Sequence, residues 1–76
     1  MKLKEWTESF GENLCDLLEE RNMTQQELSR ISGVSIGSIN SYIHKQSPPG
    51  IKAIVNISYA LDVDLIDLID FGDTID

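Results

Sequence analysis

An all-α protein of five helices is the fold class that the sequence predicts. Apolar residues recur three and four positions apart along most of the chain, which is the spacing of one helix face. No window shows the sustained alternation of apolar and polar residues that a strand needs. With 76 residues and 41% hydrophobic content, the chain suits one small globular domain. We therefore expect a single domain over 1–76, with its core at about 7–71 and a frayed tail at 72–76.

The first helix is expected over residues 7–21. Its amphipathic stripe consists of Phe10, Leu14, Leu17, Leu18 and Arg21. Thr7 or Ser9 can cap its start, and Ser9 with Glu12 has the spacing of a capping box. Asn22 tolerates the left-handed conformation that ends a helix, so the first helix should stop there.

The second helix is only about two turns long and has clear start and stop signals. In "TQQE", Thr24 caps the first turn and Glu27 reaches back to the free backbone N–H, which makes a capping box. Leu28 and Ile31 are its expected inward-facing positions. Gly33 ends the helix, because glycine adopts a positive φ without steric cost.

A third helix begins after Ser35, a good N-cap, and ends near His44, before the loop "KQSPPG". The second and third helices are joined by "SGVS". Two short helices with a glycine in the turn form a helix-turn-helix candidate at about residues 24–44. The side chains expected to fix the angle between them are Leu28, Ile31, Val34, Ile39 and Tyr42.

Two further helices complete the prediction. The fourth covers residues 51–61, where the helically spaced positions are Ile51, Ile54, Val55, Ile57, Ser58 and Leu61. The fifth covers residues 65–71, between a cap at Asp64 and a stop at Gly72. Its apolar positions are Leu65, Leu68 and Ile69.

Charge is distributed unevenly along a chain whose net charge is −7. Residues 1–27 hold seven acids and three bases, and residues 62–76 hold six acids and no base. Residues 28–61 between them hold no acid. Their bases are Arg30, Lys45 and Lys52. The acidic total argues against a nucleic-acid partner, yet a surface built from the central window would be neutral or positive.

Several classes of function are not expected. Cys15 is the single cysteine, so no internal disulfide can form, and a small domain without disulfides suits the reducing cytoplasm. We expect Cys15 and Trp6 to be packing residues. No apolar run is long enough to span a membrane, and we expect no signal peptide. With one histidine and no nucleophile, phosphate-loop or zinc pattern, we expect no enzyme, metal, cofactor or small-molecule substrate.

The chain resembles the Cro/CI, lambda-repressor-like or XRE-type, helix-turn-helix family. The segments "MTQQEL", "GVS", "SPP" and "YALDVDLIDL" follow one another at that family's spacing, over about residues 10–70. The resemblance implies a compact five-helix domain that places the second motif helix in the DNA major groove. Such domains commonly act as dimers on half-sites about one helical turn apart. It also implies a small sequence-specific DNA-binding transcriptional regulator of bacterial or phage origin.

Residues 35–44, wound as a helix, present a small and polar outer face. Candidate base contacts are Ser35, Ile36, Gly37, Asn40 and Ser41. An amide can pair with an adenine edge, a hydroxyl with several bases, and an isoleucine with a thymine methyl. Glycine lowers helix propensity by about 1 kcal/mol relative to alanine, so room is needed at Gly37. Candidate phosphate contacts are Gln25, which the resemblance places on a phosphate, and Lys45, Gln46 and Ser47.

The sequence also departs from the family pattern. Ile43 stands where the family usually has glutamate, Lys45 and Asp62 stand where it usually has glycine, and the third helix has no arginine. Ile36 and Ile43 lie close on the helical wheel, and an exposed pair would suit a protein partner. The alternative function is therefore an antirepressor or modulator of repression that binds a repressor-type protein through the same face.

The predicted partners are double-stranded operator DNA and, under the alternative, that repressor-type protein. A homodimer is also considered, because the chain has no separate oligomerisation domain. Its candidate face is on the last helix and consists of Ile66, Ile69 and Phe71.

Overall fold

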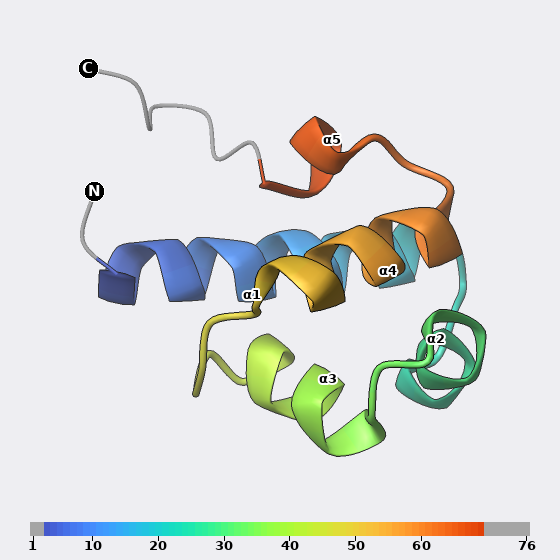
Figure 1. The fold of residues 1–76 in the computed structure, drawn as a ribbon, viewed down its shortest axis with the longest axis horizontal. Coiled ribbons are helices and arrows are strands. Elements are labelled where there is room, and N and C mark those ends of the chain that lie inside the picture. Colours follow the sequence, from blue (N-terminus) through green and yellow to red (C-terminus); the bar gives the residue numbers. More distant parts are fainter. Residues whose placement is uncertain (1–2, 70–76) are drawn as a thin grey trace.

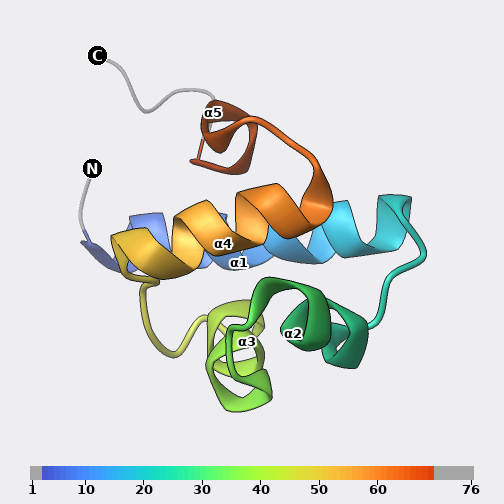
Figure 2. The same cartoon turned by 45° about the vertical axis from the view of Figure 1, so that its right-hand side comes forward.

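A computed structural model describes residues 3–69, and within that range it has five α-helices and no strand (Figure 1). In chain order they are α1 (Leu3–Glu20), α2 (Gln25–Ser32), α3 (Ile36–Ile43), α4 (Ile51–Leu61) and α5 (Leu65–Ile69). The predicted all-α class is confirmed. In Figures 1 and 2, α2 and α3 lie on one side of α1 and α4, while α5 lies on the other side. The helix-turn-helix pair therefore forms one edge of the molecule, away from α5.

All five helices contribute to one apolar core. Its members are Phe10, Leu14, Leu18, Leu28, Ile39, Tyr42, Ile54, Ile57, Leu61 and Leu68. Phe10 is fully buried, and its ring meets the Tyr42 ring edge-on with the centroids 5.8 Å apart. The Trp6 ring stacks on Phe10 with the same centroid separation, as its expected packing role requires. This row of rings links α1 to α3, and each such pair contributes about 0.5–1.5 kcal/mol beyond area burial.

The start of α1 differs from the prediction. The helix begins at Leu3 instead of residue 7, so Thr7 and Ser9 lie inside it, and the predicted cap and capping box there are wrong. Thr7 is itself buried. The physical reason is that Trp6 and Phe10, one helical turn apart, continue the apolar stripe toward the N-terminus. Burial of that stripe outweighs the preference of short polar residues for a helix end.

Two isoleucines also lie on a different face from the one expected. Ile31 of α2 is 48% exposed and Ile51 of α4 is 71% exposed. On two-turn α2 only Leu28 is fully buried, because the contacts of α2 with α3 and α4 cover a narrow stripe. Ile51 is the first residue of α4 and lies beyond the part of that helix that contributes to the core.

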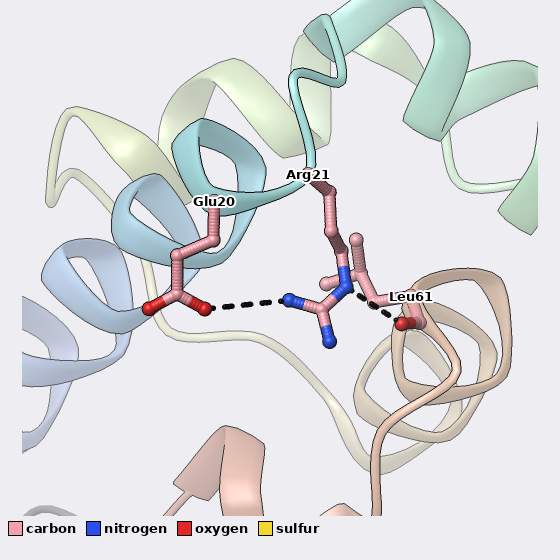
Figure 3. Close-up of polar contacts among 3 residues, drawn as sticks. All are labelled: Glu20, Arg21 and Leu61. Carbon is pink, nitrogen blue, oxygen red and sulfur yellow. Dashed lines mark hydrogen bonds and ion pairs between the residues drawn. The ribbon is translucent and has the colours of Figure 1, made fainter.

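Three helices end at a residue in the left-handed conformation, which the sequence predicted for Asn22 and Gly33. Asn22, Gly33 and Asp62 have φ values of 51°, 77° and 55°, so all three adopt the left-handed conformation that ends α1, α2 and α4. Arg21, which the sequence placed on the apolar stripe, has a different role (Figure 3). Its Nε donates to the Leu61 carbonyl oxygen at 2.9 Å. This bond ties the end of α1 to the C-terminus of α4, where a cation is favoured by the helix dipole.

The C-terminal predictions are covered only in part. α5 is described as far as Ile69. Phe71, the stop at Gly72 and the tail at 72–76 lie outside the described residues. Between residues 3 and 69, none of the helices combines the length and apolar character needed to cross a membrane.

Candidate nucleic-acid interface

The start of α2 is fixed by the predicted capping box. The Glu27 N–H donates to Thr24 Oγ1 at 3.1 Å, and the Thr24 N–H donates to Glu27 Oε1 at 3.1 Å. Thr24 itself has the extended backbone of an N-cap. The two bonds place Gln25 as the first residue of α2, where free backbone N–H groups favour an anion.

The turn between α2 and α3 is held by glycine and two hydroxyls. Gly33 adopts its left-handed conformation and donates its N–H to the Ser29 carbonyl oxygen at 2.9 Å. Ser29 Oγ donates to the Val34 carbonyl oxygen at 2.7 Å, and the Val34 N–H donates to Ser32 Oγ at 3.1 Å. The sequence identified the glycine but not the two serines. Together these bonds fix the path of the turn and so the direction in which α3 leaves it.

The two faces of α3 are divided as predicted. Ile39 and Tyr42 are buried, whereas Ile36, Gly37 and Asn40 are exposed and Ser41 is half-buried. Ser35 caps the helix by accepting the Ser38 N–H at 3.2 Å, and its own hydroxyl donates to Ser38 Oγ at 2.8 Å. A hydroxyl oxygen has two acceptor lone pairs. One accepts the Ser38 N–H, so Ser35 keeps the other for a donor outside the chain.

A contact between α2 and α3 joins two of the predicted site residues. Asn40 Nδ2 donates to Gln25 Oε1 at 3.4 Å, although the two residues are 15 positions apart. Both side chains are polar amides, and Asn40 is exposed while Gln25 is half-buried. The contact orients the Asn40 amide next to the N-terminus of α2. It therefore brings a predicted base contact and a predicted phosphate contact into one continuous surface.

The loop after α3 contains the other predicted phosphate contacts. Lys45 has a φ of 62°, and the Gln46 N–H donates to the Ser41 carbonyl oxygen at 2.8 Å, which closes the end of α3. Gln46 is exposed and Ser47 is half-buried. The Lys45 ammonium lies 3.3 Å from Glu12 Oε1 on α1, a partner that the sequence did not predict.

The predicted pair of exposed isoleucines is not present. Ile36 is 45% exposed, but Ile43 is half-buried and packs against the core. The reason is that Ile43 lies one turn after the buried Ile39, so it faces α1 together with the inner face of α3. The surface feature that suggested a protein partner for this face is therefore reduced to a single isoleucine.

Gly11 is a packing residue that the sequence did not reveal. A Cβ added at Gly11 would come within 2.5 Å of the Tyr42 carbonyl oxygen, so the backbones of α1 and α3 approach closely here. The signal was a glycine in the middle of an otherwise strong helix, which usually has a packing reason. This close approach sets the distance between α3 and the rest of the domain.

Fold and site together define a small helix-turn-helix protein. The inner face of its second motif helix packs in the core, and the outer face is exposed. The helix-turn-helix family model matches residues 16–68, from within α1 to α5. The chain belongs to this family, in its XRE or Cro/CI branch, and is a DNA-binding regulator.

Among solved structures, the chain is similar to the restriction-modification controller protein C.AhdI from Aeromonas hydrophila. The two are 22% identical and superpose with a TM-score of 0.78, over 82% of this chain and 94% of that one. At this identity the likeness shows the fold. Among curated proteins, nothing matches the chain.

Proposed function

We propose that the protein binds an operator sequence specifically, with α3 in the major groove of double-stranded DNA. The observation that carries this proposal is the outer face of α3. It is exposed, small and polar, and it lies within a stretch that has no acidic residue. An α-helix fits the major groove, where each base pair presents a distinct pattern of donors and acceptors. A carboxylate on this face would repel phosphate, and none is present there.

Specific roles follow from the chemistry of the side chains. The proposed base contacts are Ser35, Ile36, Gly37, Asn40 and Ser41. Asn40 is the strongest of these, because its amide can pair with the N6 and N7 edge of adenine. The exposed part of Ile36 suits a thymine methyl. The proposed phosphate contacts are Gln25, Lys45, Gln46 and Ser47.

Gly37 supports close approach to the groove. A Cβ added there would meet nothing within 4 Å, so the chain itself has room for a side chain. Glycine in a helix costs about 0.5–1 kcal/mol relative to alanine. Gly37 therefore costs stability although no internal contact requires a glycine there. The missing side chain would let the backbone of α3 approach the floor of the groove.

The proposal includes a homodimer of one-domain protomers in the cytoplasm, each reading one half-site. Toward the C-terminal end of α4 and on α5, the exposed apolar side chains include Tyr59, Leu65 and Ile66. Of the predicted dimer face, Ile66 is 63% exposed, Ile69 is half-buried against the core, and Phe71 lies outside the described residues. No catalytic role is proposed, since the family and the solved relative are regulators. The protein-partner alternative is not favoured, because Ile43 packs against the core.

A gel-shift assay on the DNA immediately upstream of the coding sequence tests the proposal at low and moderate salt. Asn40→Ala should weaken operator binding by about 1–3 kcal/mol for a lost base contact. Asn56→Ala, which removes the same amide from α4, is the matched control and should leave binding unchanged. The proposal fails if micromolar protein shifts no DNA at low salt, or if both variants bind like the parent.

A further inference from the structure

Lys45 is the cation nearest to the end of α3, and it is already paired within the chain. It is one of three bases between residues 28 and 61, so its charge is a large part of what this surface can offer to phosphate. Its ammonium lies 3.3 Å from Glu12 Oε1. The Lys45 side chain is 40% exposed and that of Glu12 is 65% exposed, so solvent and DNA can both reach the pair.

Two consecutive residues of α1 shape this pairing. A Cβ at Gly11 would lie 3.1 Å from Lys45 Cγ, so the absence of a side chain at Gly11 leaves the space that the lysine stem occupies. Glu12, the next residue, then meets the ammonium. The positive φ of Lys45 turns the chain at this point. The lysine therefore lies along α1 instead of projecting freely from the end of α3.

We infer that Glu12 is an intramolecular counter-ion that competes with the DNA backbone for Lys45 and thereby limits the affinity for DNA. The inference rests on the proposed function, because Lys45 is one of the phosphate contacts proposed there. A lysine that keeps a carboxylate partner neutralises no phosphate and releases no counterion from DNA. Exposed ion pairs contribute little free energy, so a phosphate that lies close to Lys45 can displace Glu12. A phosphate that lies farther from Lys45 interacts more weakly with the ammonium and displaces Glu12 less readily. Glu12 thus disfavours binding to DNA in general.

Asp16 offers a matched control. It lies one turn after Glu12 on α1 and lines the same open cavity as Lys45, together with Gly11, Cys15 and Ile43. The ion pair of Lys45 is with Glu12. Replacing either acid by its amide changes the net charge equally and at nearly the same place. Any difference between the two variants therefore reports the specific pairing and not the general field.

The test measures operator affinity of the full chain between about 50 and 200 mM salt, the range over which phosphate contacts are best resolved. The variants are Glu12→Gln, Asp16→Asn, Lys45→Gln and the double variant of Glu12 and Lys45. Glu12→Gln should bind about two- to fivefold more tightly than Asp16→Asn at low salt, the range expected for losing an exposed ion pair. Its plot of log K against log salt should be steeper by up to about 0.9, the slope of one phosphate contact. Lys45→Gln should weaken operator binding less in the parent chain than in the Glu12→Gln background, and the double variant should lose the whole gain of Glu12→Gln.

The inference is overturned if Glu12→Gln and Asp16→Asn behave alike, or if Glu12→Gln binds more weakly, since Glu12 would then hold Lys45 in place for phosphate. Both results leave operator binding itself intact. Loss of binding in every protein, the parent included, would instead refute the proposed function, and the inference would fall with it. Unchanged circular dichroism and melting temperature of each variant confirm that affinity differences do not arise from unfolding.

Discussion

The inner and outer faces of α3 are determined by different constraints. On the inner face, Ile39 is fully buried and Tyr42 meets the Phe10 ring, so packing within the domain fixes both residues. On the outer face, Asn40 and Gly37 are exposed, and nothing in the domain requires their identity beyond the contact of Asn40 with Gln25. Under the proposed function, the residues of the outer face are determined by the DNA that they contact.

Two glycines show the same difference in its simplest form. At Gly11 a side chain would collide with the Tyr42 carbonyl oxygen at 2.5 Å, whereas at Gly37 it would meet nothing within 4 Å. One glycine is needed so that α1 and α3 can approach each other. The other glycine, under the proposed function, lets α3 approach DNA. Substitutions at packed positions should therefore lower stability, whereas substitutions on the outer face of α3 should weaken DNA binding.

The largest effect is expected for Ile39→Ala. Removing a fully buried isoleucine side chain leaves a cavity at the centre of the core and should cost about 2–5 kcal/mol of unfolding free energy. Urea denaturation followed by circular dichroism measures the loss. A cost within 0.5 kcal/mol, typical of surface positions, would contradict the assignment of Ile39 to the inner face.

A smaller loss is expected for Gly11→Ala. The added methyl group must displace the backbone of Tyr42, and overpacking of this kind costs about 1–3 kcal/mol. The same urea experiment measures it, with Gly37→Ala as the control because both changes add one methyl group to a helix. Equal stabilisation of both variants would show that α1 and α3 do not approach as described.

The smallest change in stability, and one of opposite sign, is expected for Gly37→Ala. Its unfolding free energy should rise by about 0.5–1 kcal/mol, because alanine has the higher helix propensity and space is free. Operator affinity, measured by gel shift, should nevertheless fall. A variant that is more stable and binds equally well would show that close approach at Gly37 is not needed.

Local signals predicted most of the fold. The capping box at Thr24, the left-handed Gly33 and the N-cap Ser35 placed α2 and α3, and the bounds of α4 agree with those observed. These features depend on interactions within a few residues, so they can be recognised in the sequence. The start of α1 was missed, because Thr7 has the chemistry of a cap but is buried inside the helix.

The contacts between helices that the sequence did not reveal depend on distant segments. The pairs Gln25–Asn40 and Glu12–Lys45 are 15 and 33 positions apart. They form only after α2 and α1 have packed beside α3. The orientation of Ile31 was also wrong, because a two-turn helix has too few positions for periodicity to define which side is covered.

Under the proposed function, the outer face of α3 is the surface that contacts DNA. Titration of the ¹⁵N-labelled protein with operator DNA, followed by amide chemical shifts, tests it most directly. We expect the largest shifts at the N-terminus of α2, along α3 and in the loop at residues 45–47, with small shifts near Lys52 of α4. Shifts concentrated elsewhere, with Gly37 and Asn40 unchanged while DNA binds, would contradict it.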